Sequence, residues 1–221
     1  MLKVRALIVF LLYTASLPAQ VDWFAGGYVG ISTLSGDART DVNASGARFS
    51  SYKPENGPGA AVFLGRHLTE FFSVMGSYAW NRNAVALAAG EAGAPAGAVS
   101  QDYRSHMHTL LGEGMLYFRP RRSRIRPYLS AGVGGARVSA TARGAAVGFG
   151  AAAPMLPREI AQTRPAFRVA VGIDLFLTRR TSFRYSFSET LQRNPFSAAL
   201  TPPAPRNLAN FQNWFGAAFY F

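Results

Sequence analysis

Residues 165–177 read PAFRVAVGIDLFL, and this stretch carries the pattern on which the fold depends. Every second side chain is large and apolar, and most of those between are small or charged. Alternation with a period of two is typical of a β-strand whose two faces meet different surroundings. The apolar face carries Phe167, Val169, Val171, Ile173, Leu175 and Leu177, and the other face carries Ala166, Arg168, Ala170, Gly172 and Asp174.

The same kind of alternation recurs along the chain in segments of about ten residues that are separated by turn-forming residues. The expected strands are 22–33, 58–66, 70–80, 103–118, 125–140, 165–177, 182–190 and 208–221. Short connections are expected at 66–70, 119–124 and 178–181, and long ones at about 34–57, 81–102, 141–164 and 191–207. Short and long connections in alternation are typical of outer-membrane barrels.

The chain is rich in hydrophobic residues but has no segment that could form a transmembrane helix. Although 49% of the residues are hydrophobic, no segment reaches the ~18 uninterrupted apolar residues of a transmembrane helix. A protein that crosses a membrane without helices must be a closed barrel, because hydrocarbon leaves unpaired strand edges without partners. We therefore expect an all-β, eight-stranded antiparallel up-and-down transmembrane barrel at residues 20–221. The alternative is a soluble lipocalin-like carrier with its apolar face turned inward.

Residues 1–19 are expected to form a signal peptide. Lys3 and Arg5 give a positive start, residues 6–13 are apolar, and cleavage is expected after Ala19. The apolar run is shorter than the ~20 residues of a spanning helix. We therefore expect export to the cell outer membrane of a Gram-negative-type envelope. The absence of cysteine excludes disulfides and thiolate chemistry.

The net charge of +12 would by itself favour a nucleic-acid partner. The arginines are scattered rather than clustered, and an exported chain does not meet nucleic acid, so no nucleic-acid binding is expected.

Aromatic residues near strand ends predict two belts at the membrane interfaces. The belt near the short turns comprises Trp23, Phe24, Tyr28, Phe71, Phe72, Tyr117, Phe118, Tyr128, Phe176, Phe183 and 219–221, and the other comprises Tyr78, Trp80, Tyr103, Phe211 and Trp214.

Three segments carry a family resemblance: WFAGGYVG at 23–30, PYLSAGVG at 127–134 and WFGAAFYF at 214–221. With the export signal, they resemble the small outer-membrane barrels that include the OmpA transmembrane domain, OmpX and Opa-type proteins. The resemblance implies that Gly216, Phe219 and Phe221 belong to a C-terminal signal read by the barrel-assembly machinery. Trp214 stands where that signal usually has a polar residue. No periplasmic domain of the OmpA kind is expected after Phe221.

Five charged residues are candidates for a charge network inside the lumen: Glu113, Arg126, Arg168, Asp174 and Arg184. The lumen of an eight-stranded barrel has room for side chains but not for an open pore. Buried charges must pair, because an unpaired buried charge is costly. The favoured interpretation is an ion-pair core that fills the lumen and fixes register, and the alternative is a gated pore plug.

His106 and His108 share one strand face and invite comparison with catalytic or metal sites. No third metal ligand is evident, although catalytic zinc usually has three. Some related barrels are lipid A deacylases or palmitoyltransferases that use a histidine and a serine near the outer rim, and Ser105 lies beside these histidines. Neither family's motif is present, and no carboxylate is placed to orient a base. We therefore expect no enzyme activity, catalytic residue, cofactor or metal.

The function expected for this barrel is a structural or surface-interaction role of the adhesion kind. Long external loops on a rigid scaffold are where binding would occur. The alternatives are a narrow solute channel and a lipid-modifying outer-membrane enzyme. The expected partners are outer-membrane lipids and lipopolysaccharide, the barrel-assembly machinery during biogenesis, and a surface ligand bound by the long loops.

Overall fold

The computed structural model describes residues 23–35, 38–41, 48–91, 99–148, 157–196 and 207–221. The strands are β1 (Trp23–Leu34), β2 (Ala38–Asp41), β3 (Arg48–Pro54), β4 (Gly57–His67), β5 (Phe72–Glu91), β6 (Val99–Tyr117), β7 (Ile125–Gly148), β8 (Glu159–Phe176), β9 (Thr181–Arg193) and β10 (Asn207–Tyr220). Within these ranges, no helix has the length and apolarity needed to cross a membrane. The predicted signal peptide at residues 1–19 lies outside the described residues.

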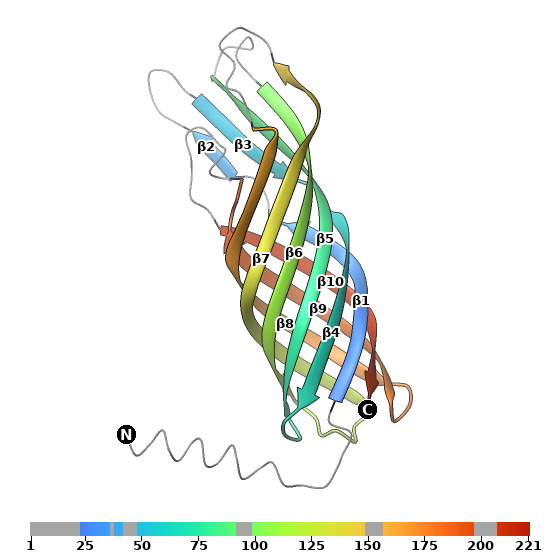
Figure 1. Cartoon of the computed structure of the whole chain (residues 1–221). Helices are drawn as coiled ribbons and strands as arrows, with labels where there is room; N and C mark the ends of the chain where they lie inside the picture. Colours follow the sequence, from blue (N-terminus) through green and yellow to red (C-terminus); the bar gives the residue numbers. More distant parts are fainter. Residues whose placement is uncertain (1–22, 36–37, 42–47, 92–98, 149–156, 197–206) are drawn as a thin grey trace, which may run out of the picture.

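Eight of the strands close into a barrel (Figure 1). The order around the barrel is β1, β4, β5, β6, β7, β8, β9 and β10, and β10 pairs again with β1. At this seam the backbone N–H of Trp23 donates to Phe221 O at 3.1 Å, and that of Phe221 donates to Trp23 O at 2.9 Å. All neighbours are antiparallel. The predicted fold class is confirmed.

The register fixes the tilt of the strands. Directly paired residues followed once around the barrel from Asp174 on β8 lead back to β8 at Arg164, ten residues away. With ~3.3 Å per residue and ~4.8 Å between strands, this stagger corresponds to a tilt of about 40°. Eight strands at this tilt enclose an interior that side chains fill.

Several strands are longer than predicted. β5 continues to Glu91 and β6 begins at Val99, while β7 continues to Gly148 and β8 begins at Glu159, so the prediction of loops at 81–102 and 141–164 is wrong for most of their length. The predicted loop at 34–57 contains the hairpin formed by β2 and β3. β4 pairs with the lower part of β5, and β3 pairs with β5 from Val85 upward. Together with β3, the upper parts of β5, β6, β7 and β8 form a wall above the other strands (Figure 1).

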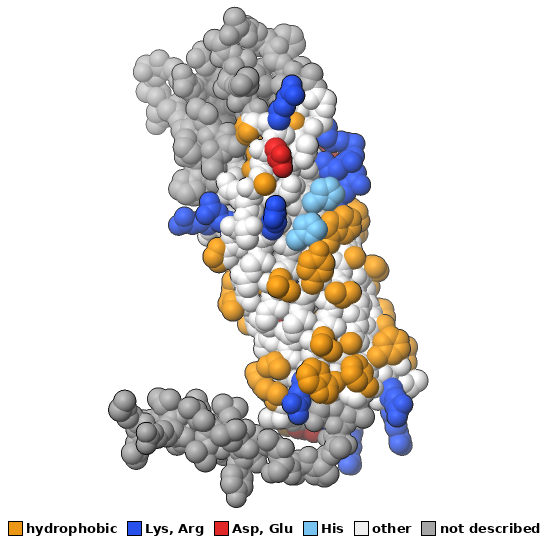
Figure 2. All heavy atoms as spheres, viewed as in Figure 1, with side chains coloured by type: hydrophobic (Ala, Val, Ile, Leu, Met, Phe, Trp, Pro, Cys, Tyr) orange, Lys and Arg blue, Asp and Glu red, His pale blue; other side chains and the backbone are white. Residues whose placement is uncertain are grey.

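In the lower part of the barrel, the apolar face of each strand points outward, as the sequence predicts. Along β8, Phe167, Val169 and Val171 are exposed, whereas Arg168 and Asp174 are buried. Figure 2 shows this as a broad zone of hydrophobic side chains that ends below in a group of Lys and Arg. Apolar-out and polar-in is the arrangement of a strand that lies between lipid and a lumen.

Above this zone the apolar side chains lie on the inward face of the strands and the polar ones on the outward face. On the upper part of β6, His106 and His108 point outward, and Tyr103 and Met107 are buried. A wholly buried apolar cluster (the upper cluster) fills the interior there: Leu34, Val85, Leu87, Tyr103, Met107, Val138, Ala140, Ile160, Phe196 and Leu208. Side chains at this level therefore follow the pattern of a water-soluble barrel, with apolar groups inside.

The two aromatic belts exist only in part. Trp23, Phe71, Phe118, Phe219 and Phe221 are exposed near the short turns. Seven residues predicted for the belts instead point into the barrel: Phe24, Tyr28, Tyr103, Tyr117, Tyr128, Trp214 and Tyr220. The parity of the strands explains the difference, because each of these side chains lies on the inward face of its strand and the residues beside it point outward.

Candidate functional site

The lower lumen is built around an ion pair between Arg184 on β9 and Asp174 on β8. Both side chains are completely buried, and Arg184 Nη2 lies 2.7 Å from Asp174 Oδ2. The hydroxyl groups of Tyr117 and Tyr220 donate to the same oxygen at 3.1 and 2.9 Å. Asp174 and Arg184 are directly paired across β8 and β9, because the short turn at the end of β8 sets the hairpin register.

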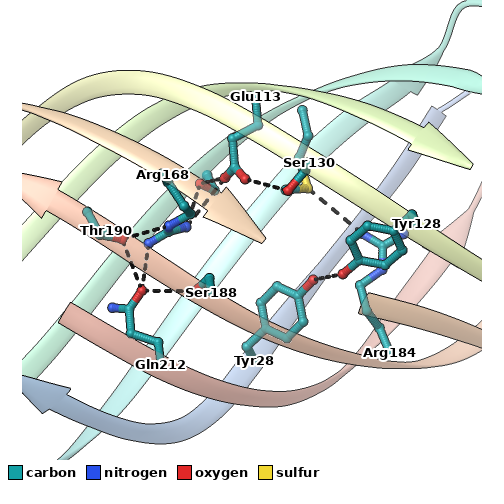
Figure 3. Close-up of polar contacts among 11 residues, drawn as sticks. Tyr28, Glu113, Tyr128, Ser130, Arg168, Arg184, Ser188, Thr190 and Gln212 are labelled. Atoms are coloured by element: carbon teal, nitrogen blue, oxygen red, sulfur yellow. Dashed lines mark hydrogen bonds and ion pairs between the residues drawn. The ribbon is translucent and has the colours of Figure 1, made fainter. Parts of the chain in front are cut away.

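Aromatic rings surround the Arg184 guanidinium. Its central carbon lies 4.9 Å from the ring centre of Phe63, 5.1 Å from that of Phe24 and 5.4 Å from that of Tyr128. Figure 3 shows Tyr128 and Tyr28 beside the arginine. A cation over aromatic faces is stabilised when it is removed from water. This explains why so many aromatic side chains point inward at this level.

Arg126 is directly paired with Asp174 in the register but forms no ion pair with a described acidic residue, and it lies at the end of the lumen that faces the short turns. Its guanidinium stands over the Tyr117 ring at 3.9 Å and donates to the backbone carbonyls of Glu70 at 3.2 Å and Arg119 at 3.4 Å. Arg126 is 1% exposed. It therefore ties the ends of β6 and β7 to the turn between β4 and β5.

The middle of the lumen contains a second network, centred on Glu113 of β6 and Arg168 of β8 (Figure 3). Arg168 Nη1 lies 3.4 Å from Glu113 Oε1, and both side chains are buried. Ser77 donates to Glu113 Oε1 at 2.6 Å and Ser130 to Glu113 Oε2 at 3.2 Å. On its other side Arg168 donates to the Thr190 hydroxyl at 3.0 Å and to Gln212 Oε1 at 3.1 Å.

This second network depends on Gly132 of β7, which lies between Glu113 and Arg168 in the register. A Cβ at position 132 would lie 2.4 Å from Glu113 Cγ and 2.6 Å from Gly112 O. Such a contact is impossible without movement of the backbone. The glycine therefore lets the glutamate lie across β7 toward its arginine.

Above the charges lies a layer of amides and hydroxyls. Ser32 donates to Asn210 Oδ1 at 2.6 Å, Asn210 donates to Asn81 Oδ1 at 3.4 Å, and Asn81 donates to Asn83 Oδ1 at 2.6 Å. The upper cluster follows above this layer. Glu113, Arg168 and the side chains beside them, including Tyr28, Tyr128 and Trp214, line a cavity of about 20 Å³. That volume is about the space of one water molecule.

The structure thus places all five predicted lumen charges inside the barrel and joins four of them in two pairs. The sequence analysis missed the uncharged partners that complete the networks, namely Ser77, Tyr117, Ser130, Thr190, Gln212 and Tyr220. Their signal is strand parity: five of them lie an even number of residues from an inward charge or glycine on their own strand, and Ser77 lies an even number of residues from the inward Asn81 and Asn83.

The residues of the predicted assembly signal lie on β10 and at the chain end. Phe219 and Phe221 are exposed on the outer face, and a Cβ at Gly216 would lie 2.0 Å from Gly27 O of β1. Trp214 points inward, where its ring lies 6.1 Å from that of Tyr28. The inward position, usually polar, is here occupied by an aromatic side chain that packs in the lumen.

His106 and His108 share the outer face of β6, whereas Ser105 is buried on the opposite face. Tyr78 Oη lies 2.6 Å from His108 Nδ1, and His106 stacks on Trp80 with ring centres 6.0 Å apart. In the described part of the chain, no three His, Cys, Asp or Glu side chains are grouped closely enough to hold a metal ion. A serine and a histidine on opposite faces are not placed for proton transfer between them.

Comparison with known proteins agrees with this architecture. The family model described as outer membrane protein beta-barrel domain matches residues 7–202. Neisserial surface protein A (NspA) is 12% identical, with a TM-score of 0.51 over 91% of this chain and 98% of NspA. The N-terminal β-barrel domain of OprF from Pseudomonas aeruginosa is also 12% identical, with a TM-score of 0.49 over 90% and 98% of the two chains.

Ail, the attachment invasion locus protein of Yersinia pestis, is 10% identical, with a TM-score of 0.45 over 90% of this chain and 99% of Ail. At these identities the likeness to NspA is one of fold alone. Among curated proteins, none matches the chain. The family model covers most of the sequence, and the closed barrel with its lipid-facing outer surface has the architecture that this family implies. The chain belongs to the outer membrane protein beta-barrel domain family.

Proposed function

We propose that this outer-membrane barrel is a non-conducting structural and surface-interaction protein that binds through its extracellular wall. The observation that carries the proposal is the filling of the lumen at successive levels. Charged and aromatic side chains fill the lower part, amides the next level, and the upper cluster the top. Because the lumen is filled, the outer surface of the barrel and its extracellular wall are the parts available for interaction.

The filled lumen argues against the alternative of a narrow solute channel. Conduction needs a path that ions or solutes enter and leave readily. The cavity among the lumen residues measures about 20 Å³, and Arg168 and Glu113 are held there by hydrogen bonds on both sides. Opening a path would require breaking these contacts and those of the Arg184–Asp174 pair.

The extracellular wall supports the surface role. β3 and the upper parts of β5, β6, β7 and β8 extend away from the short-turn end, which is periplasmic in this class of barrel. The upper cluster packs against the inner face of this wall. A wall held by its own apolar core is a rigid support for the long connections, and rigid supports with variable connections are where binding surfaces occur.

The proposal includes no catalytic activity. The serine and histidine that invited a comparison with lipid-modifying barrels, Ser105 and His106, point to opposite faces of β6. Hydroxyl and imidazole would have to meet for the histidine to act as a base. This geometry favours a binding role over a lipid-modifying one.

The surface role is tested by attachment of cells that produce the barrel. A variant in which residues 37–53 are replaced by a short Gly-Ser linker removes β2 and most of β3 but leaves the eight barrel strands intact. We expect wild-type cells to attach to heparin-coated surfaces several-fold more than cells with the shortened barrel, at equal barrel content by heat-modifiable gel migration. Equal attachment by wild-type, shortened and empty-vector cells would contradict the surface role.

A further inference from the structure

A cluster of basic side chains lies on the outer face of three neighbouring strands, and neither lumen network involves it. Arg82 comes from β5, Arg104 and the two histidines come from β6, and Arg137 comes from β7. The members of this outer basic cluster are Arg82, Arg104, His106, His108 and Arg137.

The register makes these side chains neighbours. Arg82 is paired directly with His106, and His108 with Arg137. Arg104, two residues from His106, lies diagonally opposite Arg82 on the same face. Three strands at ~4.8 Å spacing place the cluster within a span of about 10 Å across the sheet. Like charges that are neighbours on a sheet destabilise it unless something compensates them.

No carboxylate compensates the cluster among the described residues. The two buried ion pairs lie inside the barrel, and none of the five basic side chains forms an ion pair with a described acidic residue. The charges of Arg82 and Arg143 both repel Arg104. Arg104 Nε is buried and has no hydrogen-bond partner in the structure. The cluster thus has the charge and the free donors of a site for an anion.

The cluster begins where the lipid-facing surface ends. Trp80 stacks on His106 and Tyr78 contacts His108, while Leu110, two residues below His108 on β6, is 66% exposed. Figure 2 shows histidine side chains with Lys or Arg beside them at the upper edge of the hydrophobic zone. This edge lies on the side of the long connections, which is the outer leaflet in this class.

We propose that the outer basic cluster binds the phosphorylated headgroup of lipid A in the outer leaflet. Arginine suits this ligand because its planar guanidinium donates two hydrogen bonds to one phosphate. The position at the membrane edge selects an amphiphile over a soluble polyanion, since acyl chains can extend down over Tyr78 and Leu110 while the phosphates meet the arginines. Three guanidiniums on three neighbouring strands match a ligand with more than one phosphate.

The test is binding of purified lipid A to the folded barrel in detergent, measured by native mass spectrometry. The variant R82Q/R104Q/R137Q removes three charges from the cluster and keeps side chains of similar length. The matched control, R124Q/R179Q/R180Q, removes three exposed arginines from the short turns at the other end. Gel migration before and after boiling establishes that each barrel is folded.

We expect bisphosphorylated lipid A to bind the wild type and the control equally and the cluster variant at least tenfold more weakly. Dephosphorylated lipid A should bind all three weakly and alike. Equal binding of bisphosphorylated lipid A to the cluster variant and the control would overturn the site. Displacement of lipid A from the wild type by an equimolar soluble sulfated oligosaccharide would overturn the choice of ligand.

Discussion

Replacing Asp174 by Asn removes the charge that balances Arg184 without changing the shape of the side chain. Both residues are fully buried, and the guanidinium also stands among Phe24, Phe63 and Tyr128. Removing one partner of a buried pair costs about 3–5 kcal/mol, because the other charge is left uncompensated. The ratio of folded to unfolded barrel should fall by two to nearly four orders of magnitude at about 1.4 kcal/mol per factor of ten.

The measurement is urea unfolding in lipid vesicles, followed by the gel migration of folded and unfolded forms. D102N is the matched control, because Asp102 is exposed and the change should stay within about 0.5 kcal/mol. In D174N/R184M no charge remains unpaired, so the loss should be at least 2 kcal/mol smaller than the sum of the two single losses. A D174N loss no larger than that of D102N, or additive single losses, would refute the account of the pair.

Three further substitutions have defined outcomes. G132A should lower the unfolding free energy by about 1–3 kcal/mol, because the new Cβ would lie 2.6 Å from the carbonyl oxygen of Gly112. The control G112A should be neutral, since nothing lies within 4 Å of a Cβ at that position. Equal effects of the two substitutions would contradict this account. F221A should lower the amount of assembled barrel in cells several-fold but leave refolding of purified protein in detergent unchanged, and a parallel loss in both would mean a structural role only. H106A/H108A should leave the acyl-chain profile of lipid A in producing cells unchanged, and an altered profile would favour the lipid-modifying alternative.

Much of the barrel could be predicted from alternation alone. Arg168 and Asp174 share a face of one strand, and the short turn after it sets the register that opposes Asp174 to Arg184. The partnership of Glu113 with Arg168 could not be predicted, because it reaches across an intervening strand at a glycine. That contact depends on the stagger of the whole barrel, which no single hairpin determines.

The wall above the membrane was missed for a different reason. Val85 and Leu87 alternate with alanines that carry little signal, and both are apolar on the face of β5 that carries Ser77 and Asn81 lower down. A search that expects apolar residues on the same face along a whole strand ends the strand where the apolar residues move to the other face. The inversion itself marks the level at which lipid gives way to water outside the barrel.

The closed lumen is tested most directly by single-channel recording of the purified wild-type barrel in planar bilayers, with a general porin in the same bilayers as a positive control. The filled interior predicts no current steps above baseline for the wild type at voltages where the porin conducts. Reproducible open steps from the wild-type barrel would contradict the sealed lumen and favour the solute-channel alternative.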